Sequence, residues 1–549
     1  MTPSTANGRD QANTIHGLLA SRAAALRDLP FVTFEGVEWS YARTLKESQN
    51  AARGLMELGC KPGARVGMLL ENHLELLAGW FGTALAGGVH VPLNLEYRGD
   101  ILKHVLADIS VQVMFCEGYL LPNLLAAMDG TAHGIETIVV LGDAPTAASG
   151  SDSAKLVSWK EFRAIGESSG IGEFVTRAPG ALGAIMLTSG TTGVSKGVMV
   201  SDKHCITHGR EASEAYGITA VDVMYTCLPL FHANAQWATV LCAMSAGARV
   251  VISRRFSASR FWADVTQAGA THIAFLGTML HILMSQPPSP ADRLHTVRIG
   301  TSVPCPVDIM VAFERRFGFQ LIETYGNTET KRILSNRHYL RRIGSAGFAT
   351  ASSIVEVHDD EGWPVPAGTI GELVYRPREP GILTLGYLNR PEATLANLRD
   401  GWWCTGDLVW QDCDGFVYFA GRKKDALRRR GENVSAFEVE RALMTHGEVL
   451  LAAVVAAPSD LSEDEILAVI VLKPGASTRE EAVFAHANAS LPSFMVPRFI
   501  AFTDSIPETA TGKIAKEGLA ARVMQKPVWD SVKAGLSASR ARDAAASLK

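Results

Sequence analysis

The sequence lacks the features that mark secreted, membrane-spanning and zinc-binding chains. Its 549 residues hold only eight cysteines, spread singly with no Cys-x-x-Cys pair, so a disulfide scaffold and a clustered zinc site are both disfavoured. The N-terminus has no basic segment followed by an apolar one, as a signal peptide would. The longest apolar stretch, residues 76–93, contains His90, four glycines and Pro92, whereas a spanning helix needs about 20 predominantly apolar residues. We expect a soluble, cytoplasmic protein with no transmembrane segment.

The sequence also lacks a large excess of either positive or negative charge. The 52 Lys and Arg residues against 56 Asp and Glu residues leave a net charge of −4, which excludes a globally basic nucleic-acid binder. Hydrophobic residues at 47% and charged residues at 20% indicate a globular rather than a disordered chain. The one surplus is glycine, at 50 residues, and it suggests tight turns or loops whose backbone lies against a ligand.

Up to about residue 420, short apolar runs alternate with helical patterns. Helices are predicted at 45–58 and 258–267. The stretch 76–93 is predicted to be a buried helix that ends near Gly87 and is followed by a short strand. The apolar runs are typical of strands covered on both faces, and they span residues 66–70, 138–141, 184–187, 250–252 and 272–275. The alternation predicts an α/β fold with mainly parallel sheets flanked by helices.

A basic segment marks the predicted domain boundary. Residues 421–431 carry six Lys and Arg residues. Beyond them a helix at 437–444 and strands at 450–455 and 466–472 predict a compact α+β unit. We expect an N-terminal domain over 1–423, a small C-terminal domain over 424–524 and a helical or frayed tail over 525–549.

The strongest chemical signal is the segment 187–198, Leu-Thr-Ser-Gly-Thr-Thr-Gly-Val-Ser-Lys-Gly-Val. Glycines let the backbone approach an anion, hydroxyls donate hydrogen bonds, and a lysine supplies positive charge. This combination predicts a phosphate-binding loop. The pattern GxxxxGK[ST] is absent, because Lys196 precedes Gly197, and ordinary P-loop phosphoryl transfer is therefore disfavoured.

Four further motifs follow along the chain: Tyr-Gly-Asn-Thr-Glu-Thr at 325–330, Trp-Trp-Cys-Thr-Gly-Asp-Leu at 402–408, Phe-Ala-Gly-Arg-Lys-Lys-Asp at 419–425 and Thr-Gly-Lys at 511–513. Together with the segment 187–198, and in the family's order, they resemble the adenylate-forming superfamily, which contains acyl-CoA synthetases, nonribosomal adenylation domains and firefly luciferase. The resemblance extends over nearly the whole chain. The segments 228–232 and 428–435 are most similar to the acyl-CoA ligase branch.

The resemblance implies ATP, Mg²⁺ and coenzyme A as cofactors, and it gives roles to individual residues. Glu329 is expected to hold Mg²⁺, Thr328 to touch the α-phosphate, and Asp407 to bind the ribose hydroxyls beside Arg422. Lys513 is expected to bridge the acyl carboxylate and the phosphate, although by itself it would be a surface lysine. The implied nucleotide site consists of Thr188, Ser189, Gly190, Thr191, Thr192, Gly193, Lys196, Thr301, Ser302, Val303, Glu323, Thr324, Tyr325, Gly326, Asn327, Asp407, Phe419 and Arg422.

The same resemblance implies that the C-terminal domain rotates between two half-reactions. Lys424 is expected to be the hinge, and Arg430, Gly431 and Glu432 are expected to contact coenzyme A. The basic run that holds them could instead be solvated charge. His232 is implied near the thiol transfer step, with packing against its neighbours as the alternative.

The acyl group is expected to lie against Phe231, Trp237, Gly277 and Gly300, which predicts an apolar acid. The residues at 233–235 are Ala, Asn and Ala, where amino-acid-activating relatives place an Asp, so an amino-acid substrate is disfavoured.

Two departures from the family pattern leave alternatives open. Gly300-Thr-Ser-Val-Pro carries bulk where the family has small residues, and Ser195 replaces a proline. The main prediction is an ATP-dependent acyl-CoA ligase. The alternatives are an enzyme that forms thioesters from a supplied acyl-adenylate, and an acyl-AMP ligase that loads a carrier protein. A non-catalytic relative is disfavoured because the charged motif residues are intact. The expected partners are a carboxylic acid, ATP and coenzyme A, without nucleic acid, and a homodimer is compatible with the sequence.

Overall fold

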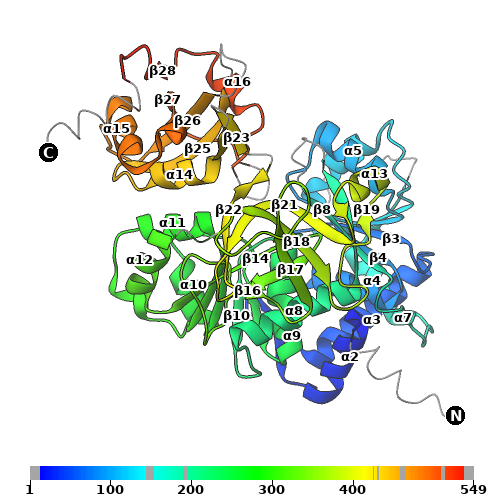
Figure 1. Cartoon of the computed structure of the whole chain (residues 1–549). Helices are drawn as coiled ribbons and strands as arrows, with labels where there is room; N and C mark the ends of the chain where they lie inside the picture. Colours follow the sequence, from blue (N-terminus) through cyan, green and yellow to red (C-terminus); the bar gives the residue numbers. More distant parts are fainter. Residues whose placement is uncertain are drawn as a thin grey trace. The chain divides into compact units, whose positions relative to one another are not determined.

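The structure, a computed structural model, describes residues 13–143, 154–188, 195–303, 305, 307–423, 426–429, 432–457, 465–508 and 514–536 (Figure 1). At positions 303, 308, 426–429, 432 and 433 it describes the backbone alone. The described chain divides into two compact units. The larger contains the residues up to Val355 together with Tyr375–Trp403, and the smaller contains Glu356–Val374 and the residues from Cys404 onward.

An eight-stranded sheet forms one layer of the larger unit. Its order is β19-β9-β8-β4-β3-β5-β6-β7, and all neighbours from β8 to β7 are parallel. Strands β9 and β19 extend it in antiparallel fashion. The strands are β3 (Arg65–Leu69), β4 (Val89–Pro92), β5 (Val113–Glu117), β6 (Thr137–Leu141), β7 (Lys155–Ser158), β8 (Leu182–Thr188), β9 (Lys196–Ser201) and β19 (Gly386–Tyr387).

A nine-stranded sheet forms the second layer, in the order β16-β15-β14-β13-β12-β10-β11-β1-β2. The strands from β14 to β1 are parallel to their neighbours, and both edges are antiparallel. The strands are β1 (Pro30–Phe34), β2 (Val37–Ser40), β10 (Val223–Thr226), β11 (Arg249–Ile252), β12 (His272–Leu276), β13 (Ile299–Val303), β14 (Gln320–Asn327), β15 (Lys331–Ser335) and β16 (Phe348–Ala349).

Helices cover both faces of each sheet, as alternate side chains of one strand show. On β5, Phe115 belongs to the core that includes α3 and α4, while Cys116 belongs to the core that includes α5 and α6. On β12, His272 stacks on Tyr216 of α8, while Phe275 contacts Phe261 of α10. Both sheets are therefore buried on two sides, which explains their continuous apolar runs.

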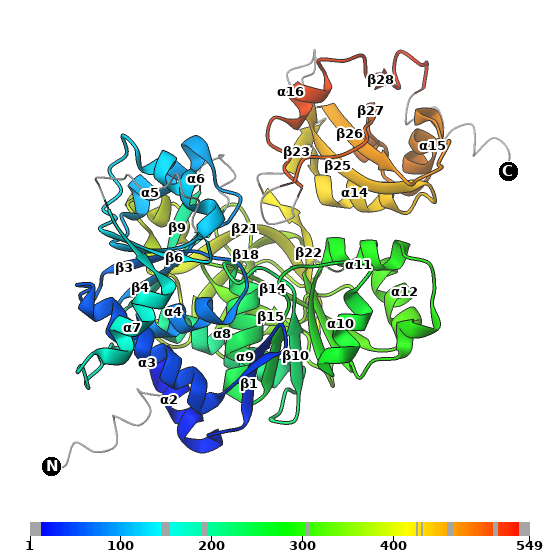
Figure 2. The same cartoon turned by 180° about the vertical axis from the view of Figure 1, so that it is seen from behind.

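The helices of the larger unit can be followed in Figures 1 and 2, where α10, α11 and α12 lie together. They are α2 (Ile15–Leu26), α3 (Tyr41–Glu57), α4 (Leu74–Leu85), α5 (Gly99–Ile109), α6 (Leu121–Met128), α7 (Trp159–Ser168), α8 (Asp202–Tyr216), the π-helix η3 (Asn234–Leu241), α9 (Cys242–Ala246), α10 (Phe261–Ala268), α11 (Gly277–Ser285), α12 (Val307–Phe317) and α13 (Pro391–Leu395), with the 3₁₀ turns η1 (Gly118–Leu120) and η4 (Pro290–Arg293).

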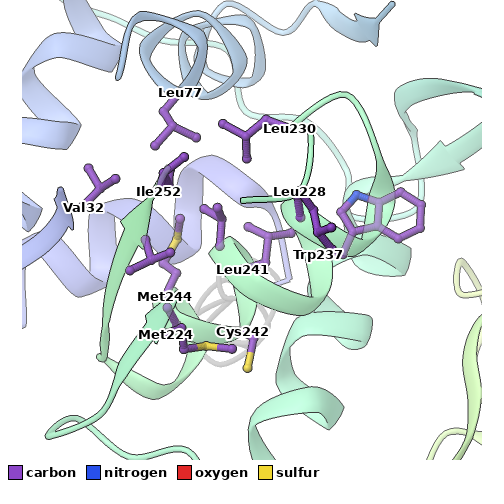
Figure 3. Close-up of a cluster of buried hydrophobic side chains, with 14 of the residues drawn as sticks. Val32, Leu77, Met224, Leu228, Leu230, Trp237, Leu241, Cys242, Met244 and Ile252 are labelled. Carbon is purple, nitrogen blue, oxygen red and sulfur yellow. The ribbon is translucent and has the colours of Figure 1, made fainter. Parts of the chain in front are cut away.

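One part of this core joins segments that are distant in the sequence. Figure 3 shows Val32 of β1, Leu77 of α4, Met224 of β10 and Leu241 of η3 converging, while the indole of Trp237 projects to one side. All of these side chains are buried. Each buried apolar side chain contributes about 1.5–3 kcal/mol relative to exposure, so this packing holds η3 firmly in the larger unit.

The smaller unit contains a separate core built around a four-stranded sheet, β25-β26-β27-β28, and helices α14 and α15. Outside this core, strands between residues 353 and 422 form a further sheet in the order β17-β18-β21-β20, with β22 beside β21. The remaining elements are β17 (Ser353–His358), β18 (Gly371–Pro377), β20 (Leu398–Arg399), β21 (Trp402–Gln411), β22 (Val417–Arg422), β23 (Ala426–Arg429), β24 (Glu432–Ser435), α14 (Ala436–Met444), β25 (Val449–Ala457), β26 (Glu465–Leu472), α15 (Glu480–Ser490), η6 (Ser493–Met495), β27 (Phe499–Phe502), α16 (Leu519–Val523) and β28 (Trp529–Asp530).

The predicted fold class is confirmed: a large α/β domain with mostly parallel sheets is followed by a C-terminal domain. The apolar stretch 76–93 is a buried helix followed by strand β4, as expected. All eight cysteines are free. Among the described residues, no helix is long and apolar enough to cross a membrane. Residues 144–153 and the part of the predicted tail from residue 537 onward lie outside the described residues, whereas Trp529–Asp530 of that tail form strand β28.

Candidate functional site

The ends of the predicted phosphate loop are held together by an antiparallel hairpin. Thr188, at the end of β8, pairs with Lys196, at the start of β9. The Thr188 hydroxyl donates to the Lys196 carbonyl over 3.4 Å, and Ser195 Oγ lies 3.0 Å from the hydroxyl of Tyr97. The two strands therefore hold the two ends of the predicted loop next to each other. Five predicted loop residues lie outside the described residues: Ser189, Gly190, Thr191, Thr192 and Gly193.

The segment that carries Thr328 and Glu329 is a tight turn between β14 and β15. Asn327 Oδ1 accepts hydrogen bonds from the backbone nitrogen of Thr330 at 2.9 Å and from its hydroxyl at 2.8 Å. The Glu329 carbonyl accepts from the Thr384 amide at 2.9 Å. The turn is thus fixed by its own side chains and by a segment remote in the sequence.

Gly326 is required for this turn. A Cβ atom there would lie 2.2 Å from the carbonyl oxygen of Lys331 and 2.5 Å from Cα of Arg332. Both contacts are with backbone that cannot easily move, so any side chain at 326 would displace the turn.

Tyr387 is a site residue that sequence reasoning missed. Its hydroxyl donates to Glu329 Oε1 at 2.8 Å, and Lys196 Nζ lies 5.3 Å from the centroid of its ring. Burial and the adjacent Glu329 carboxylate raise the pKa of Tyr387, because both disfavour the phenolate. Tyr387 therefore joins two residues that were predicted separately. A tyrosine in an apolar segment carries no charge pattern that would have identified it.

Lys331 and Glu211 form a buried ion pair that was also missed. Lys331 Nζ lies 2.6 Å from Glu211 Oε2, and it also donates to the Arg332 carbonyl and to the hydroxyls of Thr350 and Ser353. Burial lowers the pKa of Lys331 to about 8, even though Glu211 favours its charged form. This pair binds the first residue of β15 to helix α8.

The predicted residues of β13 and β14 lie on adjacent parallel strands. Ser302 is paired in register with Glu323, and Glu323 Oε1 accepts from the Cys305 amide at 3.5 Å. Thr301, Ser302 and Thr324 are buried. Tyr325 and Glu323 are partly exposed, and Val303 is described by its backbone alone. The contact of these residues with a nucleotide remains a prediction.

The predicted acyl residues come from four places in the larger unit. Trp237 lies in the π-helix η3 and Phe231 precedes it, whereas Gly277 begins helix α11 and Gly300 lies in strand β13. Trp237 is buried between the rings of His204 and His208, at centroid distances of 5.2 and 5.7 Å. Phe231 and His232 are partly exposed and in contact with one another, at 4.4 Å between ring centroids. Short π-helical segments often occur at functional sites, and the sequence did not reveal this one.

The two glycines of the predicted acyl site differ in their surroundings. Gly277 begins helix α11. A Cβ atom on Gly300 would lie 2.8 Å from Leu321 and Phe275 and 2.9 Å from Phe319. Core side chains already occupy the space on that side of Gly300, and its contact with an acyl group stays a prediction.

In the smaller unit, Asp407 and Arg422 meet as expected. They are paired in register on β21 and β22, and Arg422 Nε lies 3.1 Å from Asp407 Oδ1. The Asp407 side chain is only 5% exposed. Gly406 before it has φ +71°, and its amide donates to Glu372 Oε1 at 3.1 Å. The left-handed backbone explains why glycine precedes the aspartate.

The other predicted residues of the smaller unit are described only in part. Phe419 contacts Phe437 at 5.1 Å between ring centroids. Glu432 is described as backbone in strand β24. The remaining predicted residues, Lys424, Arg430, Gly431 and Lys513, lie outside the described residues.

A protein-only metal centre is not found in the described part of the chain, where no cluster of three or more His, Cys, Asp or Glu side chains has metal-binding geometry. Glu329 instead offers a single carboxylate with one oxygen bound to Tyr387. Mg²⁺ commonly takes one or two carboxylates together with substrate phosphates. The residues present therefore fit Mg²⁺ held jointly with a nucleotide.

Comparison with known proteins shows which family this chain belongs to. The AMP-binding enzyme family matches residues 19–388, and the AMP-binding enzyme C-terminal domain matches residues 438–513. The chain belongs to this family. It is an AMP-forming acid–thiol ligase of the acyl-CoA ligase branch, and it binds ATP.

Relatives and solved structures are similar over nearly the full length. Crotonobetaine/carnitine–CoA ligase of Salmonella paratyphi A is 30% identical over 500 residues, covering 89% of this chain and 95% of that protein. ATP-bound MatB from Rhodopseudomonas palustris has a TM-score of 0.82 at 25% identity, covering 93% and 99% of the two chains. The anthranilate CoA ligase AuaEII bound to anthranoyl-AMP has a TM-score of 0.84 at 24% identity, covering 93% and 97%, and supports the fold.

Proposed function

We propose that this protein activates a hydrophobic carboxylic acid as acyl-AMP and then transfers the acyl group to coenzyme A. The observation that carries the proposal is the convergence of Lys196 and Glu329 on Tyr387 in a chain of the AMP-binding family. A cation and an anion beside a hydroxyl-rich loop are suited to bind phosphates and their counter-cation.

The first half-reaction needs electrostatic help rather than a general base. The substrate carboxylate is already ionised at neutral pH, since its ordinary pKa is about 4. Its oxygen attacks the α-phosphorus of ATP, and the bond to the leaving pyrophosphate breaks. Lys196 is placed to offset phosphate charge, and Lys513 would bridge the two anions. Glu329 would hold Mg²⁺ together with the phosphates, and the bound ion would supply further positive charge.

The second half-reaction transfers the acyl group to a thiol. The sulfur of coenzyme A attacks the acyl carbon, its proton is lost, and AMP departs. Lys424 would act as the hinge of a mobile C-terminal domain that serves the two steps in turn. Arg430, Gly431 and Glu432 would contact coenzyme A, with His232 near the reacting thiol.

The class of acid is inferred from residues of this chain rather than from its relatives. The relatives named above are ligases for acids of different kinds, crotonobetaine or carnitine in one and anthranilate in another. The buried indole of Trp237 and the aromatic ring of Phe231 support an apolar acyl group for this protein.

A panel of carboxylic acids with ATP and coenzyme A tests the proposal, with acyl-AMP and acyl-CoA measured separately by mass spectrometry. We expect both products from an apolar acid. Acyl-CoA formed only from added acyl-AMP would favour thioester formation without adenylation, and acyl-AMP with no acyl-CoA would favour a carrier-protein acceptor. The variant Lys513→Ala should lose adenylation but keep thioester formation from preformed acyl-AMP; equal loss of both would contradict domain rotation.

A further inference from the structure

Three segments distant in the sequence meet at Tyr387. Its ring faces the ammonium group of Lys196, with Nζ 5.3 Å from the ring centroid. Its hydroxyl donates to Glu329 Oε1 at 2.8 Å. A cation within about 6 Å of an aromatic face is attracted by the ring quadrupole, and a carboxylate accepts a strong hydrogen bond from a phenol. One side chain therefore holds a cation on its face and an anion at its tip.

The backbone of Tyr387 is fixed to the strand that carries Lys196. Strand β19 pairs with β9, with Tyr387 opposite Val198. The amide of Leu388 donates to the Gly197 carbonyl at 2.8 Å. The Tyr387 amide itself donates to Thr394 Oγ1 at 2.9 Å. The tyrosine is thus held beside the end of the phosphate loop and cannot swing away without breaking the sheet edge.

The backbone of Glu329 is fixed to the same segment. Its carbonyl accepts from the Thr384 amide at 2.9 Å, and the Thr384 hydroxyl donates to the Met199 carbonyl of β9 at 2.8 Å. Both the main chain and the carboxylate of Glu329 are therefore bound to residues 384–387. This double attachment sets the position of the carboxylate relative to Lys196.

A lysine and a glutamate that contact the same side chain could instead pair with each other, and each would then be less available to a ligand. Within the described part of the chain no ion pair joins Lys196 to Glu329; each contacts Tyr387 instead. We infer that Tyr387 is a positioning residue that keeps Lys196 and Glu329 apart, so that Lys196 stays available to phosphate and the second oxygen of Glu329 to a divalent cation.

This inference rests on the proposed function, because it assumes that a nucleotide and its cation bind at these two residues. It assigns separate roles to the hydroxyl and the ring of one side chain. The hydroxyl serves the carboxylate and hence cation binding, whereas the ring serves the ammonium group and hence phosphate binding. Removing the hydroxyl alone should therefore weaken cation binding, whereas removing the whole ring should weaken phosphate binding as well.

Two substitutions separate these roles. Tyr387→Phe keeps the ring and removes the hydrogen bond to Glu329, while Tyr387→Leu removes both. The matched control is Tyr119→Phe, because the Tyr119 hydroxyl also donates to a carboxylate, Glu71 Oε1, at 2.9 Å, and the residue is 57% exposed on the same unit. Thermal unfolding of each variant first shows that the fold is retained.

The direct measurement is binding of Mn²⁺·ATP by electron paramagnetic resonance without any acid, followed by the Mg²⁺ dependence of acid-dependent pyrophosphate exchange. We expect Tyr387→Phe to weaken Mn²⁺·ATP binding and raise the Mg²⁺ half-saturation about tenfold, the effect of one hydrogen bond to a charged group, with KM for ATP at saturating Mg²⁺ near the wild-type value. Tyr387→Leu should in addition raise that KM about tenfold. Tyr119→Phe should match the wild type.

Two results would overturn the inference: Tyr387→Phe indistinguishable from Tyr119→Phe in cation binding, or Tyr387→Phe and Tyr387→Leu equal in both cation dependence and KM. These results are distinct from failure of the proposed function. A wild-type protein that binds Mn²⁺·ATP tightly but makes no acyl-AMP with any acid would contradict the function, while the binding differences among the variants would still stand.

Discussion

The buried pair of Lys331 and Glu211 allows a quantitative test of how the turn before β15 is held. Lys331→Met keeps the length of the side chain but leaves the Glu211 carboxylate buried, with the Ser352 amide at 2.7 Å as its remaining hydrogen-bond donor. Removing one partner of a buried ion pair costs about 3–5 kcal/mol. We expect Lys331→Met to lower the free energy of unfolding of the larger unit by about 4 kcal/mol.

A surface pair provides the matched control. Lys203 lies on the same helix as Glu211, and its Nζ is 2.9 Å from Glu379 Oε2, whose side chain is 56% exposed. Solvent screens such a pair, so Lys203→Met should cost less than about 1 kcal/mol. The double variant Lys331→Met/Glu211→Gln removes both charges, and it should recover at least half of the loss seen for Lys331→Met alone.

The assay is urea unfolding followed by tryptophan fluorescence, together with hydrogen exchange of a peptide that covers residues 325–335. Hydrogen exchange assigns the loss to the turn rather than to the smaller unit. Two results would contradict a coupled buried pair. One is that Lys331→Met destabilises the protein no more than Lys203→Met. The other is that the effects of Lys331→Met and Glu211→Gln add in the double variant.

Three further predictions follow from other described contacts. Burial lowers the pKa of His272 to about 3, so below pH 6.5 the unfolded chain takes up a proton that the folded chain does not. The wild type should therefore lose about 2 kcal/mol more stability than His272→Phe between pH 7 and pH 5, as measured by urea unfolding. An equal loss in the two proteins would contradict this. Gly326→Ala should destabilise the larger unit by about 3 kcal/mol, because its Cβ meets backbone at 2.2 Å; Gly170→Ala, with nothing within 4 Å, should be nearly neutral by calorimetry. Arg422→Ala should raise the ATP KM about fivefold, because it removes the ion pair that Arg422 makes with the buried Asp407. Arg422→Lys should be intermediate, and unchanged kinetics would argue against their nucleotide role.

Strand positions were predictable because burial leaves a direct mark on the sequence. The run at 66–70 corresponds to β3 (Arg65–Leu69), and the run at 272–275 corresponds to β12 (His272–Leu276). Both sheets are covered by helices on two faces, so their strands are continuously apolar. The same reasoning separated the helix α4 from strand β4 at a pair of glycines.

Motif residues were predictable where local chemistry demanded them. Gly326 and Gly406 precede Glu329 and Asp407 because the backbone there is crowded or left-handed. The position of Arg422 beside Asp407 was expected only from the resemblance to the adenylate-forming superfamily. The crowding at Gly326 and the left-handed backbone at Gly406 depend on a few neighbouring residues, and a glycine in the sequence indicates them.

Long-range partners were not predictable. Tyr387 is close to Lys196 only because β19 pairs with β9, and Lys331 meets Glu211 only because β15 packs near α8. Neither Tyr387 nor Glu211 stands in a segment whose pattern indicates a site. Their roles depend on which strand edge and which helix face come together.

By itself, the sequence determined the alternation of strands and helices and the residue types that carry charge, and it predicted a phosphate-binding loop after β8. These follow from periodicity and from the chemistry of individual side chains. Only the tertiary structure decided that one tyrosine lies between the lysine and the glutamate, and that a buried ion pair fixes the turn beside them. The physical reason is that hydrogen bonds and ion pairs act over a few ångströms, and residues distant in the sequence reach that range only when the sheets have formed and packed.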